Sequence, residues 1–366
     1  MDAREEHNEK LERLRALMES SGVDAIWLRR ISSFAWLTAG AADYVSLADE
    51  HGIASLLVTK QQAFLITNTI EAPRLREEEG LAELGLEWHV APWYEPIDPR
   101  AVLAAGSLIG ADEPYPETVN LAAPIASMRS QLLPAEVERM RVLGRRCGLA
   151  MSAAIEQVVP GMTEWEIAGL LAHQAYNQGV TPVLTLIAVD ERTQQYRHPI
   201  PTDKKLARYA MLILSGRRRG LVASLTRSVH FGPVPKELRA RSEACARVDA
   251  TLIAHTRPGA RLADIFEAGM KAYAAAGYRK EWMHHHQGGI AGYEGREEKA
   301  RPASTAIVVE GQAFAWNPTI AGVKSEDTII VGPLGNEVVT VTPGLPIMTL
   351  RIKGEIISRP AILERP

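Results

Sequence analysis

The fold is decided by one segment that occurs twice, as PGMTEWEI at residues 160–167 and as PGARLADI at residues 258–265. The copies end at Gly179 and Gly277, so the spacing of 98 residues holds throughout without a gap. Each copy predicts a turn, a helix start and a helix of similar length, followed by a strand-like region. A solenoid would show several shorter repeats. The repeat therefore predicts one domain with two related halves and a cleft between them.

Composition places the chain among ordinary globular proteins. It has 366 residues, a hydrophobic share of 46%, a charged share of 23% and a net charge of −3. This length allows two domains of about 150 residues or more. The one basic run, at residues 217–219, lacks interleaved aromatic residues, and no stretch approaches eighteen apolar residues. We therefore expect a cytoplasmic protein with a small-molecule substrate and neither a nucleic-acid nor a membrane partner.

The first third of the chain alternates helical and strand patterns. Leucines at three- and four-residue spacing predict a helix over residues 5–21, and a strand follows at residues 24–28. Residues 54–59 and 63–67 predict a hairpin across three polar residues. This order is typical of a small α/β domain, which we assign to residues 1–133. A long helical pattern then begins at Pro134 and opens a second domain, residues 134–366.

Two strand motifs of the second domain carry a family resemblance. They are GLVASLTRS at residues 220–228 and VKSEDT at residues 323–328. At these motifs the chain resembles the pita-bread family, which includes creatinase, prolidase, aminopeptidase P and methionine aminopeptidase. The resemblance covers essentially the whole chain. It implies an α/β (α+β) fold, with a creatinase/prolidase-like N-terminal domain, a pseudo-twofold pita-bread catalytic domain and a homodimeric assembly.

The resemblance also locates the family's dinuclear metal centre, which uses two Asp, one His and two Glu. The corresponding positions here are listed in family order: Ile213, Ser224, at or near Gly289, Asn317 and Glu326. One carboxylate cannot hold hard divalent cations, which need several oxygen or imidazole donors in a fixed geometry. We therefore expect the dinuclear centre to be absent, with no metal and no cofactor.

Two residues are the predicted catalytic groups. His198 resembles the histidine that creatinase uses as general acid and base, although a histidine before a proline is otherwise a common loop residue. Glu326 would orient His198 or a water molecule, or bind a cationic substrate group. The alternative for Glu326 is a strand residue bonded to Lys324 or Arg227.

The predicted binding residues come from the segment HHHQGGIAGYEGRE at residues 284–297 and from one residue beyond it. Imidazoles can move protons, hold a metal or bind an anion, and glycines allow close approach of the backbone to a ligand. In an extended segment neighbouring side chains point to alternate sides, so at most two of the three histidines face one pocket. The substrate-binding candidates are His284, His285, His286, Gln287, Tyr293, Arg296 and Asn317.

Two alternatives remain open for this segment. Two of its histidines could form a replacement metal site together with His198 and Glu326. Arg296 could clamp a substrate carboxylate with Tyr293, or could instead be a surface residue paired with a neighbouring glutamate, Glu294 or Glu297. By the family resemblance, Arg296 stands where peptidase members often carry a second histidine, so we expect the charge pattern of the substrate to differ from theirs.

The leading functional hypothesis is a creatinase-like, metal-independent hydrolase that acts on a C–N bond. Its substrate would be a small amino-acid-like, amide or guanidino compound. A second hypothesis is an Xaa-Pro peptidase with a non-standard metal site. A third is a non-catalytic protein that keeps the cleft as a small-molecule pocket.

Overall fold

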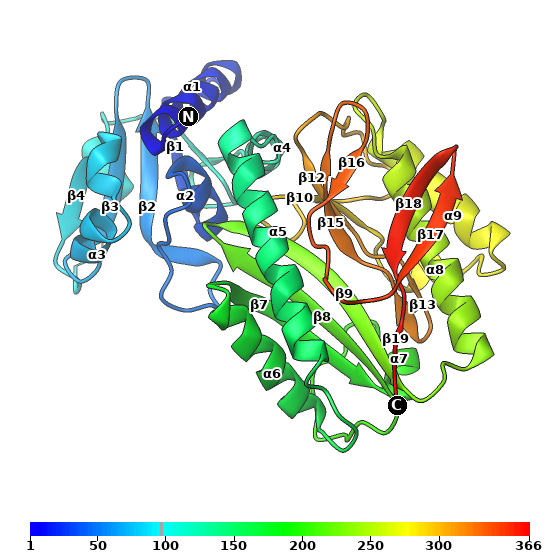
Figure 1. The fold of residues 1–366 in the computed structure, drawn as a ribbon. Helices are drawn as coiled ribbons and strands as arrows, with labels where there is room; N and C mark the ends of the chain where they lie inside the picture. Colours follow the sequence, from blue (N-terminus) through cyan, green and yellow to red (C-terminus); the bar gives the residue numbers. More distant parts are fainter. Residues whose placement is uncertain (96–97) are drawn as a thin grey trace. The chain divides into compact units, whose positions relative to one another are not determined.

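A computed structural model describes residues 1–95 and 98–366 and divides them into two compact units (Figure 1). The first unit comprises Met1–Ala135 and the short segment Arg219–Leu221, and the second comprises Glu136–Arg218 and Val222–Pro366. None of the helices in the described ranges combines the length and apolarity needed to cross a membrane.

The first unit is a mixed sheet with helices. Its elements are α1 (Ala3–Ser21), β1 (Ala25–Arg30), α2 (Ile31–Leu37), β2 (His51–Thr59), β3 (Ala63–Asn68), α3 (Ala72–Glu77), η1 (Leu81–Leu84), β4 (Glu87–Ala91), η2 (Pro99–Val102), β5 (Ile109–Ala111), β6 (Val119–Asn120) and α4 (Ala122–Arg129). The strand order is β4-β3-β2-β1-β5-β6. The expected hairpin is confirmed, because β2 and β3 pair antiparallel with Val58 opposite Ala63.

The second unit begins with the long helix α5 and contains two larger sheets. Its elements are α5 (Pro134–Ile155), α6 (Glu164–Asn177), β7 (Thr181–Val189), α7 (Arg192–Gln195), β8 (Tyr209–Arg218), β9 (Leu221–Phe231), α8 (Lys236–His255), α9 (Leu262–Ala275), η3 (Glu281–His284), β10 (Gly288–Ala291), β11 (Glu298–Lys299), β12 (Ala313–Trp316), β13 (Thr319–Ile320), β14 (Val323–Lys324), β15 (Asp327–Val331), β16 (Asn336–Val338), β17 (Ile347–Ile352), β18 (Glu355–Pro360) and β19 (Leu363–Arg365).

The internal repeat is confirmed in the helices of this unit. Helix α6 runs from residue 164 to 177 and α9 from 262 to 275, so both ends keep the 98-residue spacing. The glycine that opens each copy, Gly161 or Gly259, has a positive φ of 92° or 85°, which suits a glycine in the turn before the helix. Thr163 then caps α6 through a capping box with Glu166.

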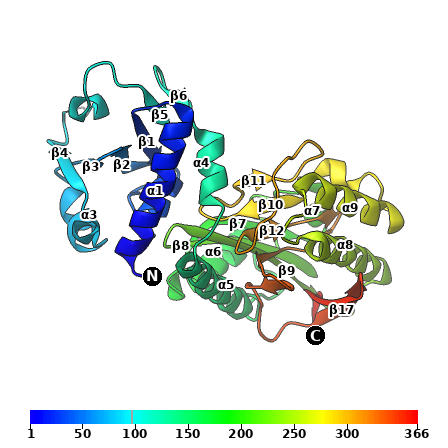
Figure 2. The ribbon, with the colours of Figure 1, turned by 90° about the horizontal axis from the view of Figure 1, so that it is seen from above.

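Each half of the unit packs helices against a sheet. Helix α6 packs on β7 and β8 of the sheet ordered β19-β9-β8-β7, while α8 and α9 pack together (Figure 2). The buried apolar side chains of α8 and α9 form one core with those of β10, β12 and β15. The sheet ordered β11-β10-β12-β15-β16 thereby gains a packed face. This packing fixes the strands that carry the polar residues described next.

Candidate functional site

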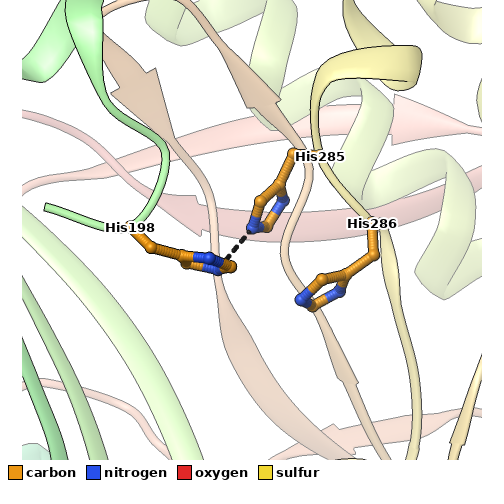
Figure 3. A group of neighbouring side chains, drawn as sticks. All are labelled: His198, His285 and His286. Carbon is orange, nitrogen blue, oxygen red and sulfur yellow. Dashed lines mark hydrogen bonds between the residues drawn. The ribbon is translucent and has the colours of Figure 1, made fainter.

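Three histidines from two distant segments of the second unit form one cluster. His198 lies between α7 and β8, whereas His285 and His286 lie between η3 and β10. Their potential ligand nitrogens lie within 4.8 Å of one another. Figure 3 shows His198 on one side and the other two rings opposite it, with Nε2 of His198 and Nε2 of His285 joined by a 3.0 Å hydrogen bond. The fold thus brings together predicted site residues that lie 87 positions apart.

The two histidines that join His198 in the cluster, His285 and His286, are consecutive in sequence, whereas an extended segment would place every second side chain on one side. The rings of His285 and His286 stack with centroids 4.4 Å apart and an interplanar angle of 25°. His284 is exposed and lies outside the cluster. His284 is separated from the other two by a change of backbone conformation, because η3 ends at His284 and the chain becomes extended only at His285 (φ −158°, ψ 147°). A strict alternation of side chains therefore does not apply across this junction.

The environment keeps the clustered imidazoles neutral near neutral pH. Burial, followed by the charge of Lys324, lowers the pKa of His285 far below its ordinary value. Burial and then the Arg296 guanidinium lower the pKa of His286 to about 3. Burial also lowers the pKa of His198, which the nearby Glu326 carboxylate partly restores. A neutral imidazole carries a lone pair on one ring nitrogen, so the cluster can accept protons or bind a metal ion.

The Gln287 side chain holds the backbone of the segment that carries His285 and His286. Its amide nitrogen donates to the backbone oxygens of Trp282, at 3.2 Å, and of His285. Its amide oxygen accepts a 2.7 Å hydrogen bond from the buried Tyr273 hydroxyl, to which the Thr319 backbone amide also donates. The predicted substrate-binding amide of Gln287 therefore holds the backbone between η3 and β10 in place.

The predicted site residues Arg296 and Glu326 form a buried ion pair with each other. Arg296 Nη2 donates to Glu326 Oε1 at 3.0 Å, and Thr226 Oγ1 donates to Glu326 Oε2 at 2.6 Å. Both carboxylate oxygens of Glu326 are thus engaged. The sequence alternatives had paired these two residues with other partners, so this pairing is a finding of the structure.

Lys324 is a further site residue. From the sequence it is expected only as a possible partner of Glu326. It lies on β14, and burial lowers the pKa of its ammonium group while the Glu326 carboxylate raises it. Its charge acts on the pKa of all three clustered histidines. The available sequence signal is a lysine two residues before Glu326, within the VKSEDT motif that carries the family resemblance.

Two further predicted binding residues, Tyr293 and Asn317, differ in whether their side chains have hydrogen-bond partners. The Tyr293 hydroxyl donates to Glu136 Oε1 at 2.6 Å and accepts from Arg139 at 3.3 Å. The Asn317 side-chain oxygen is buried without a hydrogen-bond partner among the described residues, while its backbone amide donates to Gln287. Asn317 thus retains a buried acceptor that a ligand could satisfy.

The positions that correspond to the family's dinuclear centre do not fit two metal ions. Ile213 offers a buried aliphatic side chain, and the Ser224 hydroxyl is hydrogen-bonded to Ser215 at 2.9 Å. Asn317 offers only an amide, and both oxygens of Glu326 are engaged. Hard divalent cations need a richer oxygen donor set than these side chains supply.

Gly289, the position nearest to the family's metal-binding histidine, has no room for a side chain. Its φ of +154° lies in the region that favours glycine. A Cβ atom there would lie 2.1 Å from the Glu298 backbone oxygen and 2.9 Å from the Ala300 backbone nitrogen. These atoms belong to the strand β11 and the residue after it, and β11 pairs with β10 at Gly289. The close pairing of the two strands therefore requires glycine.

Comparison with known families matches both units. Residues 138–333 match the model described as metallopeptidase family M24, and residues 10–131 match the creatinase/prolidase N-terminal domain. The first match spans more than half of the chain and contains the histidine cluster, Arg296 and Glu326.

The sequence and the structure of this chain are similar to those of several known proteins, although the sequence identity is low. The chain is 21% identical over 355 residues to a Xaa-Pro dipeptidase of Pyrococcus horikoshii, with 92% of this chain and 97% of that protein covered. It is 27% identical to the uncharacterized hydrolase/peptidase y4tM of Sinorhizobium fredii over 57% of either protein. The crystal structure of the prolidase from Pyrococcus horikoshii aligns with a TM-score of 0.78 at 20% identity, covering 91% of this chain and 98% of that chain. This structural likeness establishes the shared fold.

Proposed function

We propose that this chain, which belongs to metallopeptidase family M24, hydrolyses a C–N bond in a small substrate without the family's dinuclear metal centre. The observation that carries the proposal is the cluster of three neutral imidazoles, within 4.8 Å of one another, in the same unit as the buried pair of Arg296 and Glu326. Independence from the two-metal centre, a homodimeric assembly and a cytoplasmic location stay predictions that accompany this proposal.

The cluster supplies the proton transfers that hydrolysis needs. The more exposed imidazole of His198 is the proposed general base, which takes a proton from the attacking water and returns it to the leaving nitrogen. His285 is hydrogen-bonded to His198 and would fix the position of its ring. Arg296 and Lys324 would stabilise the negative charge that develops on the carbonyl oxygen during the attack.

The positive charge around the histidine cluster favours a peptide-like substrate over the guanidino substrate of the leading, creatinase-like hypothesis. Lys324, Arg296 and Lys299 all act on the pKa of His286, and Arg197 also acts on that of His285. Such surroundings attract a substrate carboxylate and repel a guanidinium group. A dipeptide and creatine both carry a free carboxylate, so the guanidinium group is what distinguishes the two substrate classes. The similarity to a Xaa-Pro dipeptidase points in the same direction.

One observation keeps a non-catalytic function in view. Four of the five positions that correspond to the family's metal ligands carry other residue types, and the fifth, Glu326, is neutralised by Arg296. A binding protein with this site would take up a carboxylate-bearing small molecule and release it unchanged. It would show saturable binding without turnover.

The test is hydrolysis by untagged, chelator-treated protein of a panel that contains Xaa-Pro dipeptides, other dipeptides, creatine and guanidino acids. We expect turnover of a dipeptide and a loss of about 100-fold or more in kcat/KM for His198→Ala, the size typical of a removed acid-base group. His284→Ala, outside the cluster, should stay within about twofold of wild type. Full activity of His198→Ala would refute the assigned role, and saturable binding without turnover would favour the non-catalytic function.

A further inference from the structure

We infer that His198, His285 and His286 bind a single transition-metal ion of the zinc class and leave its fourth coordination position open. This site differs from the family's oxygen-rich dinuclear centre in its residues, its donor atoms and its number of ions. It rests on the proposed function and deepens it by adding a ligand to the same site, and it replaces the expectation that the site is metal-free. In the ion-bound protein, His198 would be a ligand rather than the general base, because the ion would take the lone pair of its Nε2 atom. It also differs from the replacement site considered from sequence, because Glu326 is engaged by Arg296 and Thr226.

The geometry is close to that of a three-histidine site. Zinc–nitrogen bonds are about 2.0–2.1 Å long, so two ligand nitrogens of a tetrahedral ion lie about 3.4 Å apart. Nε2 of His198 and Nε2 of His285 are 3.0 Å apart, and all three ligand nitrogens lie within 4.8 Å. Ring movements of about 1 Å would bring the three nitrogens to bonding distance. Figure 3 shows the three rings close together.

The donor chemistry points to the same class of ion. Three histidines with an open fourth position are a pattern of catalytic zinc sites, whereas calcium and magnesium prefer oxygen ligands. Imidazole binds a metal only in its neutral form, and burial keeps the rings of His285 and His286 neutral. The cluster therefore needs no change in protonation state before it accepts an ion near neutral pH.

Ion binding would reorganise the hydrogen bonds of the cluster. The ion would replace the bond between Nε2 of His198 and Nε2 of His285, because both lone pairs would then point to the metal. Ligation of His286 through Nε2 would place its proton on Nδ1, so the 3.3 Å contact from the Gly288 amide would open. These changes involve side-chain rotations and leave the Gln287 anchor in place.

The surrounding charges set the affinity and the fourth ligand. Besides the rings themselves, the charged groups that act on the cluster are Lys324, Arg296, Lys299, Arg197 and Glu326. Arg296 is paired with Glu326 and Arg197 with Glu281, so the net positive charge in this set comes from Lys324 and Lys299. This charge opposes a bare dication and favours an ion that carries an anionic ligand, such as hydroxide or a substrate carboxylate. Replacement of Lys324 by Met should therefore tighten metal binding, by about tenfold for each 1.4 kcal/mol of repulsion removed.

The experiment measures metal uptake directly. Untagged, chelator-treated protein is dialysed against Zn²⁺ or Co²⁺, and bound metal is quantified by plasma emission spectrometry and, for Co²⁺, by visible absorption. We expect one ion per chain and a tetrahedral Co²⁺ spectrum for wild type and for His284→Ala. His285→Ala and His286→Ala should lose stoichiometric binding, and Lys324→Met should bind more tightly.

The controls separate folding from binding and binding from function. The Co²⁺ spectrum of the wild-type protein tests the site without any substitution, so a misfolded variant cannot decide the result. Substoichiometric uptake by wild type, or equal loss in His284→Ala and His285→Ala, would overturn the inference. Hydrolysis by ion-free protein would overturn a catalytic ion while leaving the proposed function intact. Stoichiometric uptake without turnover would support the site and refute the proposed function.

Discussion

Arg296 Nη2 donates a 3.0 Å hydrogen bond to Glu326 Oε1, and the side chains of the two residues are 9% and 4% exposed. Glu326 is the carboxylate that remains at the family's metal-ligand positions, and Arg296 places a positive charge against it. An internal cation thus binds the oxygen that corresponds to a metal ligand in metallopeptidase relatives. This pair leaves neither Glu326 oxygen free for an ion, so the inferred metal site uses imidazoles instead.

Removal of one member of this pair should destabilise the fold strongly. Arg296→Met leaves a buried carboxylate unpaired, and Glu326→Gln leaves a buried guanidinium unpaired, each at a cost of about 3–5 kcal/mol. The double variant should cost less than the sum of the two single variants, because it removes both charges. Urea unfolding of the four proteins measures the coupling. Strict additivity would show that the two side chains do not interact in solution.

The hydroxyl of Thr226 should contribute separately to the position of Glu326. Thr226→Val keeps the shape of the side chain and removes the 2.6 Å hydrogen bond to Oε2. Hydrogen bonds to charged groups contribute about 1.5–3 kcal/mol, so the free energy of unfolding should fall by that amount. Thr251→Val, whose hydroxyl bonds a backbone oxygen at an exposed place on α8, is the matched control and should change stability by less than about 0.5 kcal/mol.

The histidine cluster should make the ion-free protein sensitive to acid. The native pKa of His286 is about 3, whereas an unfolded histidine has a pKa of about 6.5. Below pH 6.5 the unfolded chain therefore binds a proton that the native chain does not. The stability that His286 contributes is complete above pH 6.5 and is lost as pH falls toward 3.

Partial exposure of His286 makes the ideal slope, about 1.4 kcal/mol per pH unit for one proton, an upper bound. Urea unfolding of chelator-treated protein between pH 7.5 and 4 measures it. His286→Asn should flatten the slope, whereas His284→Asn should leave it unchanged. An equal slope in wild type and His286→Asn would mean that His286 titrates normally in the native state.

The Tyr273 hydroxyl should affect metal binding by the histidine cluster through its hydrogen bond to Gln287. Tyr273→Phe removes the donor to Gln287 and an acceptor for the Thr319 amide, which leaves buried polar groups unpaired at a cost of about 1–3 kcal/mol. Gln287 would then hold the backbone of His285 less firmly. We expect weaker Co²⁺ binding with a retained tetrahedral spectrum. Tyr176→Phe, at an exposed position, should alter neither stability nor binding.

Much of the fold could be predicted because it depends on local patterns. The hairpin of β2 and β3 follows from two apolar runs around a polar turn, and the paired helices α6 and α9 follow from the repeated turn and helix start. The resemblance of two strand motifs then identified the architecture. Each of these signals comes from short stretches of sequence and needs no knowledge of which distant residues touch.

The site could be predicted only in part, because its contacts join distant segments. The sequence indicated His198 and the histidine triplet separately, but their approach across 87 positions depends on how the second unit folds. The selection of His285 and His286 over His284 depends on where η3 ends. The partner of Arg296 was missed for the same reason, since Glu294 and Glu297 are near in sequence but Glu326 is near in space.

The backbone at Gly289 limits which substitutions could create a two-metal ligand set in this chain. A histidine introduced there would place its Cβ 2.1 Å from the backbone oxygen of Glu298 on β11. This obstacle is main chain, so rotation of a neighbouring side chain cannot remove it. Carboxylates introduced at Ile213, Ser224 and Asn317 would therefore leave the ligand set incomplete unless β11 also took a different course.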